Sequence, residues 1–385
     1  MGGQVTAGRP VRVLLVNPSP IRGGAEEMLA AFLRGFDPAR IEATVACLAP
    51  GPFPDELIAA GHHVHSIDAG RMRQVRRYER AVRAVSRPAR KADLVCSWQV
   101  KGHYYGTPAA RIARRPAVWW DHGIRPKRGE QSAFAAGTIP KLLSARLVLT
   151  SSHAAAVRHA RAVAIHPGID TERFASARAS QRAASRAAFG VAPDEPLVGI
   201  VGRLQPWKGQ HVFLRAAARV ASRQPRAKFL IAGDALGGFS AAYPDELRTL
   251  AADLGIADRV IFAGARDDVP AVLAALDVFV HASVEEPFGI VIVEALAARV
   301  PVVATRGGGV GEIVTDGVDG YLVGCGDNEA MAARIDSLVS KPSVAARLAA
   351  AGQARARSAF TAERMVEQFT AVLERFAPRR IKERV

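Results

Sequence analysis

The chain has 385 residues, of which 49% are apolar and 23% charged, and these values predict an ordinary globular protein of two or three domains. A formal net charge of +16 implies an anionic partner, which is nucleic acid, an anionic lipid surface or a phosphorylated substrate. Three cysteines without metal spacing favour a reducing compartment, and no apolar run approaches the ~20 residues of a membrane span, so we expect a cytoplasmic protein.

The first half of the sequence alternates apolar, β-branched runs with segments of helical spacing, a pattern typical of βαβ units. We expect strands at 11–16, 41–48, 63–67, 93–97, 117–120, 147–150 and 162–165. We expect helices at 25–36, 54–60 and 107–114. Between the third and fourth strands, apolar residues recur every three or four positions among arginines, which predicts a basic amphipathic helix over 71–91.

A stretch rich in alanine, arginine and serine begins near residue 171. We place the interdomain connection at 167–177 and a helix over 180–189. A second alternating series follows, with strands expected at 197–201, 228–232, 260–262, 278–281 and 300–304. Its helices are expected at 210–222, 243–254, 268–275, 290–298, 329–338 and 361–376.

Two separate runs of strand and helix predict an α/β protein of two doubly wound, Rossmann-like domains facing across a cleft. We assign residues 1–175 to the first domain and residues 176–360 to the second, and we expect the last helix, about 361–385, to pack back on the first. Because doubly wound sheets bind ligands at the carboxyl ends of their strands, functional residues should follow the strands.

The first such position comes after the strand 197–201. Arg203 and Lys208 stand five positions apart in a loop that also holds two glycines and a proline. Both side chains can converge on one anion, such as a diphosphate whose charge develops as a glycosidic bond breaks. A solvated basic loop explains the same two residues equally well.

A pair of glutamates follows the strand 278–281. Glu286 precedes a helix that should begin at Gly289, whose free backbone N–H groups can face a phosphate. Glu294 stands inside that otherwise apolar helix, where a buried carboxylate needs polar partners. Sugar hydroxyls would supply such partners, whereas an amphipathic helix with Glu294 in solvent would need none.

Glycine clusters and a histidine mark three further strand ends. Residues 307–311 follow the strand 300–304, and Gly23 and Gly24 follow the first strand, so both segments suit anion contact at the start of a helix. His122 follows the strand 117–120. A lone histidine is more often structural, but one at a strand end opposite an anion site is a candidate for catalysis.

Together these segments resemble the family 4 glycosyltransferases of the GT-B fold. The pair Glu286 and Glu294, with seven residues between them that include Pro-Phe-Gly, is the most specific match. The other matching segments are 202–209, 231–234 and 301–320 in the second half and, more loosely, 23–26, 122–123 and 165–170 in the first. One departure is Gly311, which stands where many relatives carry proline.

The resemblance implies transfer with retention of anomeric configuration and without a metal or other cofactor. The first domain would bind the acceptor and the second the nucleotide-sugar donor. The implied catalytic residues are His122, Glu286, Arg203 and Lys208. The implied donor-binding residues are Gly23, Gly24, Arg203, Lys208, Gly233, Asp234, Arg266, Glu286, Phe288, Gly289, Ile290, Val291 and Glu294.

Within these sets the resemblance gives each charged group a role. Arg203 and Lys208 would bind the diphosphate, and Glu286 the sugar hydroxyls. Glu294 would bind the ribose, and Arg266 would lie near the base. His122 would lie near the sugar and the reacting bond. In line with metal independence, the sequence contains no Asp-X-Asp pair, P-loop or zinc spacing.

The resemblance implies a uridine or guanosine diphosphate sugar as donor and a glycan, a lipid-linked molecule or a small molecule as acceptor. The basic helix 71–91 either docks on the inner face of an anionic membrane or packs on the sheet with a solvated face. An epimerase, hydrolase or phosphorylase of the same fold is the nearest alternative. We expect no nucleic-acid partner, because the basic residues are not interleaved with aromatic ones.

Overall fold

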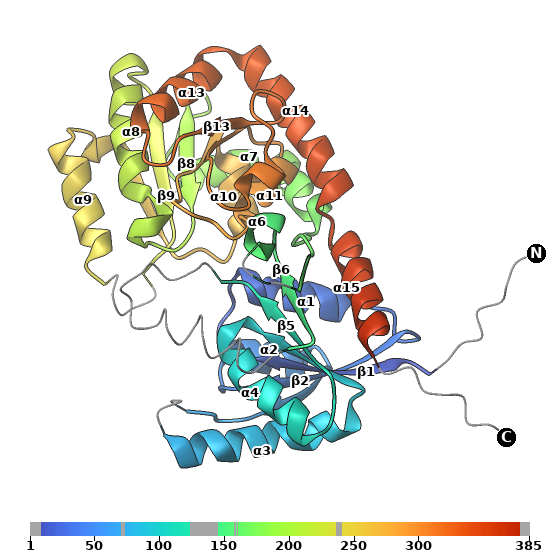
Figure 1. Cartoon of the computed structure of the whole chain (residues 1–385). Coiled ribbons are helices and arrows are strands. Elements are labelled where there is room, and N and C mark those ends of the chain that lie inside the picture. Colours follow the sequence, from blue (N-terminus) through green and yellow to red (C-terminus); the bar gives the residue numbers. More distant parts are fainter. Residues whose placement is uncertain are drawn as a thin grey trace, which may run out of the picture. The chain divides into compact units, whose positions relative to one another are not determined.

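The computed structural model describes residues 9–70, 74–123, 145–157, 159, 161–235 and 241–377. It divides into two compact units, one made of residues up to 168 together with those from 362 onward, the other of residues 169–361. Each unit is a parallel sheet with helices on both faces (Figure 1), which confirms the doubly wound α/β prediction. Residues 71–73 of the predicted basic helix and 378–385 of the predicted last helix lie outside the described residues.

Within its described residues, the first unit contains seven parallel strands in the order β3-β2-β1-β4-β5-β6-β7. These are β1 (Val11–Asn17), β2 (Ile41–Cys47), β3 (His63–Ser66), β4 (Leu94–Trp98), β5 (Ala117–Asp121), β6 (Leu147–Thr150) and β7 (Ala162–Ala164). The helices described in this unit are α1 (Gly24–Gly35), α2 (Pro52–Ala59), α3 (Val75–Lys91), α4 (Gln99–Ile112), α6 (His153–Ala156) and α15 (Ala362–Phe376). The strand order reverses between β1 and β4.

The described part of the second unit contains six strands in the order β10-β9-β8-β11-β12-β13. These are β8 (Leu197–Val201), β9 (Lys228–Ala232), β10 (Val260–Gly264), β11 (Val278–His281), β12 (Val302–Thr305) and β13 (Tyr321–Val323). Its described α-helices are α7 (Thr171–Ala188), α8 (Gln210–Arg223), α9 (Tyr243–Asp253), α10 (Val269–Ala275), α11 (Ile290–Ala297), α12 (Val310–Ile313), α13 (Asn328–Ser340) and α14 (Pro342–Ala359). Two short 3-10 turns are η1 (Pro206–Lys208) and η3 (Ala257–Arg259).

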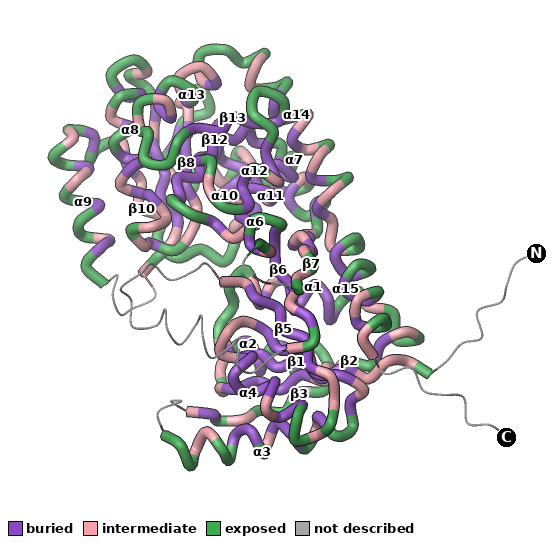
Figure 2. The backbone as a smooth tube through the Cα atoms, viewed as in Figure 1, coloured by how far each residue is buried: buried purple, intermediate pink, exposed green. Residues whose placement is uncertain are grey.

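Burial follows the alternation of side chains along the strands. In the second unit, Leu197 and Phe279 face a core shared with α7, α10 and α11, whereas Val198 and Val280 face a core shared with α8, α9 and α13. Figure 2 shows the result, with buried strands between helices that expose one face. Within the described ranges, no helix combines the length and the apolar character needed to cross a membrane.

The helix predicted at 107–114 begins earlier than expected, because α4 starts at Gln99. Its two glycines are packing positions. A Cβ at Gly102 would lie 2.7 Å from the carbonyl oxygen of Val16, and one at Gly106 would lie 2.2 Å from Ser97 Oγ. Glycine therefore lets the helix approach β1 and β4, a tertiary reason that helical spacing does not reveal.

The helix predicted at 180–189 also begins earlier than expected, because α7 starts at Thr171. The boundary between the two units, after Gly168, lies within the connection predicted at 167–177, but most of that segment is helical. Arg178 Nη1 donates to the carbonyl of Ala274 at 2.8 Å, and Arg186 Nη1 donates to that of Ala275 at 2.9 Å. These arginines satisfy carbonyls at the end of α10 that have no helical partner. A polar sequence thus forms a well-packed helix.

Three other elements were not predicted, and they are the short helix α6, the strand β13 and the 18-residue helix α14. β12 starts at Val302, two residues later than expected. β13 has only three residues, too few to give a readable alternation.

Candidate functional site

The sheet of the second unit reverses its strand order between β8 and β11, which pair in parallel. In doubly wound sheets, the loops at such a reversal leave the strands toward opposite faces, and ligands bind between them. The loop after β8 carries Arg203 and Lys208, and the loop after β11 carries Glu286. Three of the four charged residues singled out from the sequence therefore lie at one ligand-binding position of the fold.

Backbone contacts join the β8 and β11 loops. The N–H of Val284 donates to the carbonyl of Trp207 at 2.9 Å. Gly209 has a φ of 75°, and a Cβ there would lie 2.0 Å from the carbonyl oxygen of Ala282. Only glycine tolerates both conditions, so this residue lets Lys208 lie against the β11 loop.

Glu286 is the centre of the resulting cluster. Its side chain is buried, and its Oε2 atom lies 2.5 Å from Lys208 Nζ, 3.1 Å from Ser283 Oγ and 3.2 Å from His281 Nε2. Within the described residues, its other oxygen, Oε1, forms no hydrogen bond or ion pair. One carboxylate oxygen is thus fixed by the protein, and the other can accept a hydrogen bond from a ligand.

The charges of the cluster keep Glu286 ionised. Burial by itself would raise the pKa of Glu286, but the charge of Lys208 and the hydrogen bonds from His281 and Lys208 outweigh burial and hold the pKa at about 2. Lys208 Nζ also lies 4.2 Å from the centroid of the Trp207 ring, a favourable cation–π position. At neutral pH the site therefore contains a carboxylate and an ammonium in direct contact.

The glycine cluster after β12, residues 307–311, packs against the backbone of Glu286. Gly308 has a φ of 60°, and a Cβ there would lie 2.0 Å from the carbonyl oxygen of Glu286. The N–H of Gly309 donates to the same carbonyl at 2.9 Å. A Cβ at Gly307 would lie 2.7 Å from the carbonyl oxygen of Val284. Close backbone approach gives these glycines a structural reason in addition to the predicted anion contact.

The helix α11 begins directly after Gly289, which has a φ of 107°. Ile290 and Val291 occupy the first turn, where backbone N–H groups have no helical partner. Phe288 is buried, with its ring centroid 5.7 Å from that of Phe360. Glu294 lies half-buried further along the same helix. The free N–H groups at the start of α11 and Glu294 therefore belong to one short helix, which directly follows the loop that carries Glu286.

Arg203 and the loop after β9 lie next to each other through backbone contacts. The N–H of Leu204 donates to the carbonyl of Asp234 at 3.0 Å, and a Cβ at Gly233 would lie 2.0 Å from the carbonyl oxygen of Gly202. The Arg203 side chain is exposed and has no ion pair in the described part of the chain. Arg203 can therefore bind an anion without first breaking an ion pair, whereas Lys208 is already paired with Glu286.

Arg266 follows β10 and is already paired. Its Nε donates to Asp268 Oδ1 at 2.7 Å, and its guanidinium carbon lies 5.7 Å from the centroid of the Phe189 ring. The Arg266 guanidinium is therefore paired with a carboxylate and lies near an aromatic ring.

In the first unit, the predicted residues Gly23 and Gly24 lie at the start of α1, the helix that follows β1, and the sheet reverses its strand order between β1 and β4. Glu26 in the first turn is buried and accepts a hydrogen bond from Gln99 Nε2 at 2.6 Å. This bond joins the start of α1 to the start of α4, directly after β4. The glycines thus lie at the reversal point of their own sheet.

His122 follows β5 in an aromatic setting. Its ring centroid lies 5.1 Å from that of Trp98 and 5.4 Å from that of Trp120, and its Nδ1 lies 3.3 Å from Ser151 Oγ. Its Nε2 is buried without a hydrogen-bond partner among the described residues. Burial lowers the pKa of His122 to about 3, so the ring is neutral at physiological pH.

Two further candidate functional residues were not predicted from the sequence. His281 and Ser283 both contact Glu286 Oε2, and both are buried. The sequence did contain a signal for these two residues, since His281 is the one polar residue of the strand 278–281 and Ser283 follows two positions later. Their shared target could not be read from spacing, because it depends on how the loop folds back.

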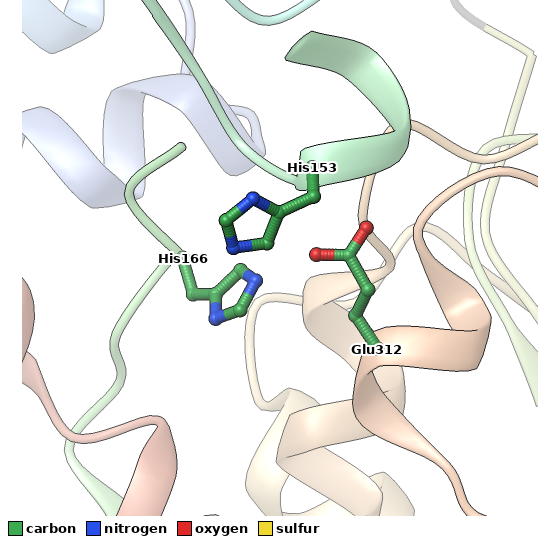
Figure 3. A group of neighbouring side chains, drawn as sticks. All are labelled: His153, His166 and Glu312. Carbon is green, nitrogen blue, oxygen red and sulfur yellow. The ribbon is translucent and has the colours of Figure 1, made fainter. Parts of the chain in front are cut away.

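Two further histidines of the first unit were not predicted to meet. Figure 3 shows His153, at the start of α6, edge-on to His166, and their ring centroids are 5.7 Å apart. Glu312, drawn in the same view, belongs to the second unit. Because the three side chains come from both units, we assign them no common site.

Two family models match in succession along the chain. The model described as Glycosyltransferase Family 4 matches residues 22–173, and the model described as Glycosyl transferases group 1 matches residues 181–355. The D-inositol 3-phosphate glycosyltransferase of Mycobacterium sp. (strain KMS) is 43% identical over 188 residues, which are 48% of this chain and 41% of that relative. The chain thus aligns with less than half the length of this curated relative.

Solved structures match over nearly the whole chain. HepE of Anabaena in complex with UDP and glucose is 30% identical, with a TM-score of 0.83, and the match covers 94% of this chain and 99% of that one. Sucrose-phosphate synthase from Thermosynechococcus elongatus is 20% identical, with a TM-score of 0.77 and coverage of 95% and 98%. The second likeness concerns the fold alone.

Proposed function

The chain belongs to the GT-B glycosyltransferases, and from this premise we propose that it transfers a sugar from a nucleoside-diphosphate sugar to an acceptor hydroxyl, with retention of configuration. A uridine donor is favoured over a guanosine one, because the 30% identical HepE carries UDP and glucose in its crystal structure. The transfer needs no metal in this proposal, since cationic side chains neutralise the diphosphate.

The observation that carries the proposal is the contact of Lys208 with Glu286 at the reversal point of the second sheet. An ammonium suits a diphosphate, and an ionised carboxylate with one unoccupied oxygen suits sugar hydroxyls. A nucleotide sugar offers these two groups side by side. Glu294, further along α11, is proposed to bind the ribose, and the loops that hold Gly233, Asp234 and Arg266 to bind the base.

In the proposed reaction, the bond between the anomeric carbon and the diphosphate oxygen breaks, and the acceptor oxygen bonds to that carbon on the same face. The proton of the acceptor hydroxyl leaves with the nucleoside diphosphate. Because negative charge grows on the diphosphate in the transition state, Lys208 and Arg203 stabilise that state more than the bound donor. These two cations would do the work of a metal ion.

His122 is proposed to lie near the donor sugar as a neutral hydrogen-bonding group. A pKa of about 3 makes it a poor proton carrier at neutral pH, whereas its buried Nε2 lacks a partner within the described residues. The backbone around Gly23 and Gly24 is proposed to add N–H donors to the donor phosphates.

The first unit, which is proposed to bind the acceptor, is also proposed to dock on an anionic membrane through α3. Five arginines at alternating four- and three-residue steps are exposed along this helix, and they are Arg76, Arg80, Arg83, Arg87 and Arg90. The opposite face packs into the sheet, with Val82 and Val85 buried. Each basic residue near an anionic bilayer contributes about 1 kcal/mol of attraction. A lipid-linked acceptor would then be reached from the surface of the bilayer.

Co-sedimentation with vesicles of phosphatidylcholine, alone or mixed with phosphatidylserine, tests the membrane docking. Replacing three of the α3 arginines by glutamine should lower binding to anionic vesicles by about 100-fold. The matched control carries the same change on the exposed α8 residues Arg215, Arg219 and Arg223. Equal binding to both kinds of vesicle, or none to either, would remove this part of the proposal.

Donor binding is tested by thermal shift with UDP, GDP, UDP-glucose and GDP-mannose. A ligand at 100 times its dissociation constant adds about 2.7 kcal/mol of stability. Turnover is then measured as release of nucleoside diphosphate with and without acceptors, including D-inositol 3-phosphate because that molecule is named in the curated relatives. Release that never depends on an acceptor would instead indicate a hydrolase or an epimerase, and transfer would be refuted.

A further inference from the structure

The partners of Glu286 fall into two groups. Lys208 comes from the loop after β8, and in the proposed function it also has to engage the donor diphosphate. His281 and Ser283 come from the end of β11 and the loop that follows it, and both are buried away from solvent. When a diphosphate arrives, the Lys208 ammonium shares its charge with a second anion. The hold on Oε2 then depends on the two buried partners.

The direction of each hydrogen bond follows from what a carboxylate can do. An ionised carboxylate only accepts, so His281 presents an N–H from Nε2 and Ser283 donates its hydroxyl. His281 Nδ1 is buried and has no partner within the described part of the chain. Nε2 is therefore the ring nitrogen through which His281 acts on Glu286.

The backbone that carries these two residues has anchors on the sheet that do not involve the Lys208 side chain. The carbonyl of Ser283, in the loop after β11, accepts a hydrogen bond from Thr305 Oγ1 at 2.5 Å, at the end of β12. His281 is the last residue of β11, which pairs with β12. His281 and Ser283 are therefore held by β11 and β12 and need not move when a ligand binds next to Lys208.

We propose that His281 and Ser283 are positioning residues, which hold Glu286 Oε2 so that Oε1 stays directed toward the donor sugar while Lys208 engages the diphosphate. The inference rests on the proposed function, because it needs a donor with both a diphosphate and a sugar. It extends that function by separating recognition of the sugar from recognition of the nucleotide. Loss of either residue should affect the sugar and spare the nucleoside diphosphate.

The test compares binding of UDP with binding of UDP-glucose by isothermal titration, together with the steady-state parameters for transfer. His281→Leu removes the donor to Oε2, whereas His281→Gln places an amide N–H at a similar distance along the side chain. Ser283→Ala removes the second donor. His211→Leu is the matched control, because His211 is a histidine of the same unit that bonds to Tyr243.

We expect His281→Leu to bind UDP within about twofold of the wild type but to lose about 10-fold or more in affinity for UDP-glucose, which corresponds to about 1.4 kcal/mol. The kcat for transfer should fall together with the affinity for UDP-glucose. His281→Gln should restore most of the loss, and Ser283→Ala should shift the same quantities in the same direction. The control should change neither ligand selectively.

Two results would overturn the inference. Equal losses of UDP and UDP-glucose affinity in His281→Leu, without rescue by His281→Gln, would mean that the residue only supports the fold. Unchanged affinity and kcat in both His281→Leu and Ser283→Ala would mean that Lys208 alone positions Glu286. If the wild type binds neither ligand, the proposed function itself fails, which the first titration already reveals.

Discussion

Replacement of Gly308 by alanine should displace Glu286 without touching any charge. A Cβ at Gly308 would lie 2.0 Å from the carbonyl oxygen and 3.1 Å from the nitrogen of Glu286. Because a carbon and an oxygen need more than about 3 Å, the Glu286 segment has to move by about 1 Å. A displacement of that size in a group that positions substrate lowers the rate about 100-fold.

The substitution also has a backbone cost, since Gly308 has a φ of 60° and alanine adopts such a conformation at about 1–2 kcal/mol. Two other glycines separate the two effects. Gly317 has a φ of 75°, but a Cβ there would meet no described atom within 4 Å, so Gly317→Ala carries the backbone cost alone. Gly311 has no positive φ, and a Cβ there would meet no described atom within 4 Å, so Gly311→Ala should change neither stability nor activity.

The assay is release of nucleoside diphosphate under steady state, paired with urea unfolding. We expect kcat/KM to fall about 100-fold only in Gly308→Ala, and the free energy of unfolding to fall by at least about 1 kcal/mol in both Gly308→Ala and Gly317→Ala. A folded Gly308→Ala variant with wild-type kcat/KM would refute the reasoning, because the backbone contact would then not position Glu286.

Three further predictions concern charged and titrating groups. Arg203→Ala should weaken UDP binding about 10-fold while unfolding stays within about 0.5 kcal/mol of wild type, because the side chain is exposed and has no ion pair among the described residues; titration calorimetry and urea unfolding measure the two effects. Lys208→Met should lose both UDP binding and stability, since it leaves the Glu286 carboxylate buried without its cation, and wild-type stability in this variant would contradict the pairing. Because burial lowers the pKa of His122 to about 3, the unfolded chain binds its proton more readily between about pH 3 and 6.5. This residue therefore makes stability rise with pH over that range, and unfolding at pH 5 and pH 7 should show a smaller difference in His122→Gln.

Five of the six described strands of the second unit were predicted, because each is largely a run of apolar residues bounded by glycine, proline or charge, whereas β13 has only three residues. The strands 197–201, 228–232 and 278–281 match the structure at both ends. The helices α4 and α7 were mispredicted because their deciding contacts are tertiary. Glycines that allow close packing and arginines that satisfy the end of another helix look like breaks or loops in a single sequence.

The position of the site in the fold was predictable, whereas the contacts between its side chains were not. Lys208 and Glu286 could be placed at neighbouring strand ends, since the reversal of strand order follows from the fold class. Their direct contact could not be predicted, because they stand 78 positions apart in the chain and the loop conformations decide it. His281 and Ser283 escaped because a histidine and a serine at a strand end have many uses.

The backbone fixes the spacing of the charges before any ligand binds. The N–H of Gly233 donates to the carbonyl of Gly264 at 2.7 Å, which joins the ends of β9 and β10. Similar bonds join the loop after β8 to those after β9 and β11, and the loop after β11 to that after β12. These connections hold the rim of one sheet, so a donor would find its partners already placed. Exposed side chains such as Arg203 can then change affinity alone, whereas a change in the glycines beneath Glu286 alters affinity and stability together.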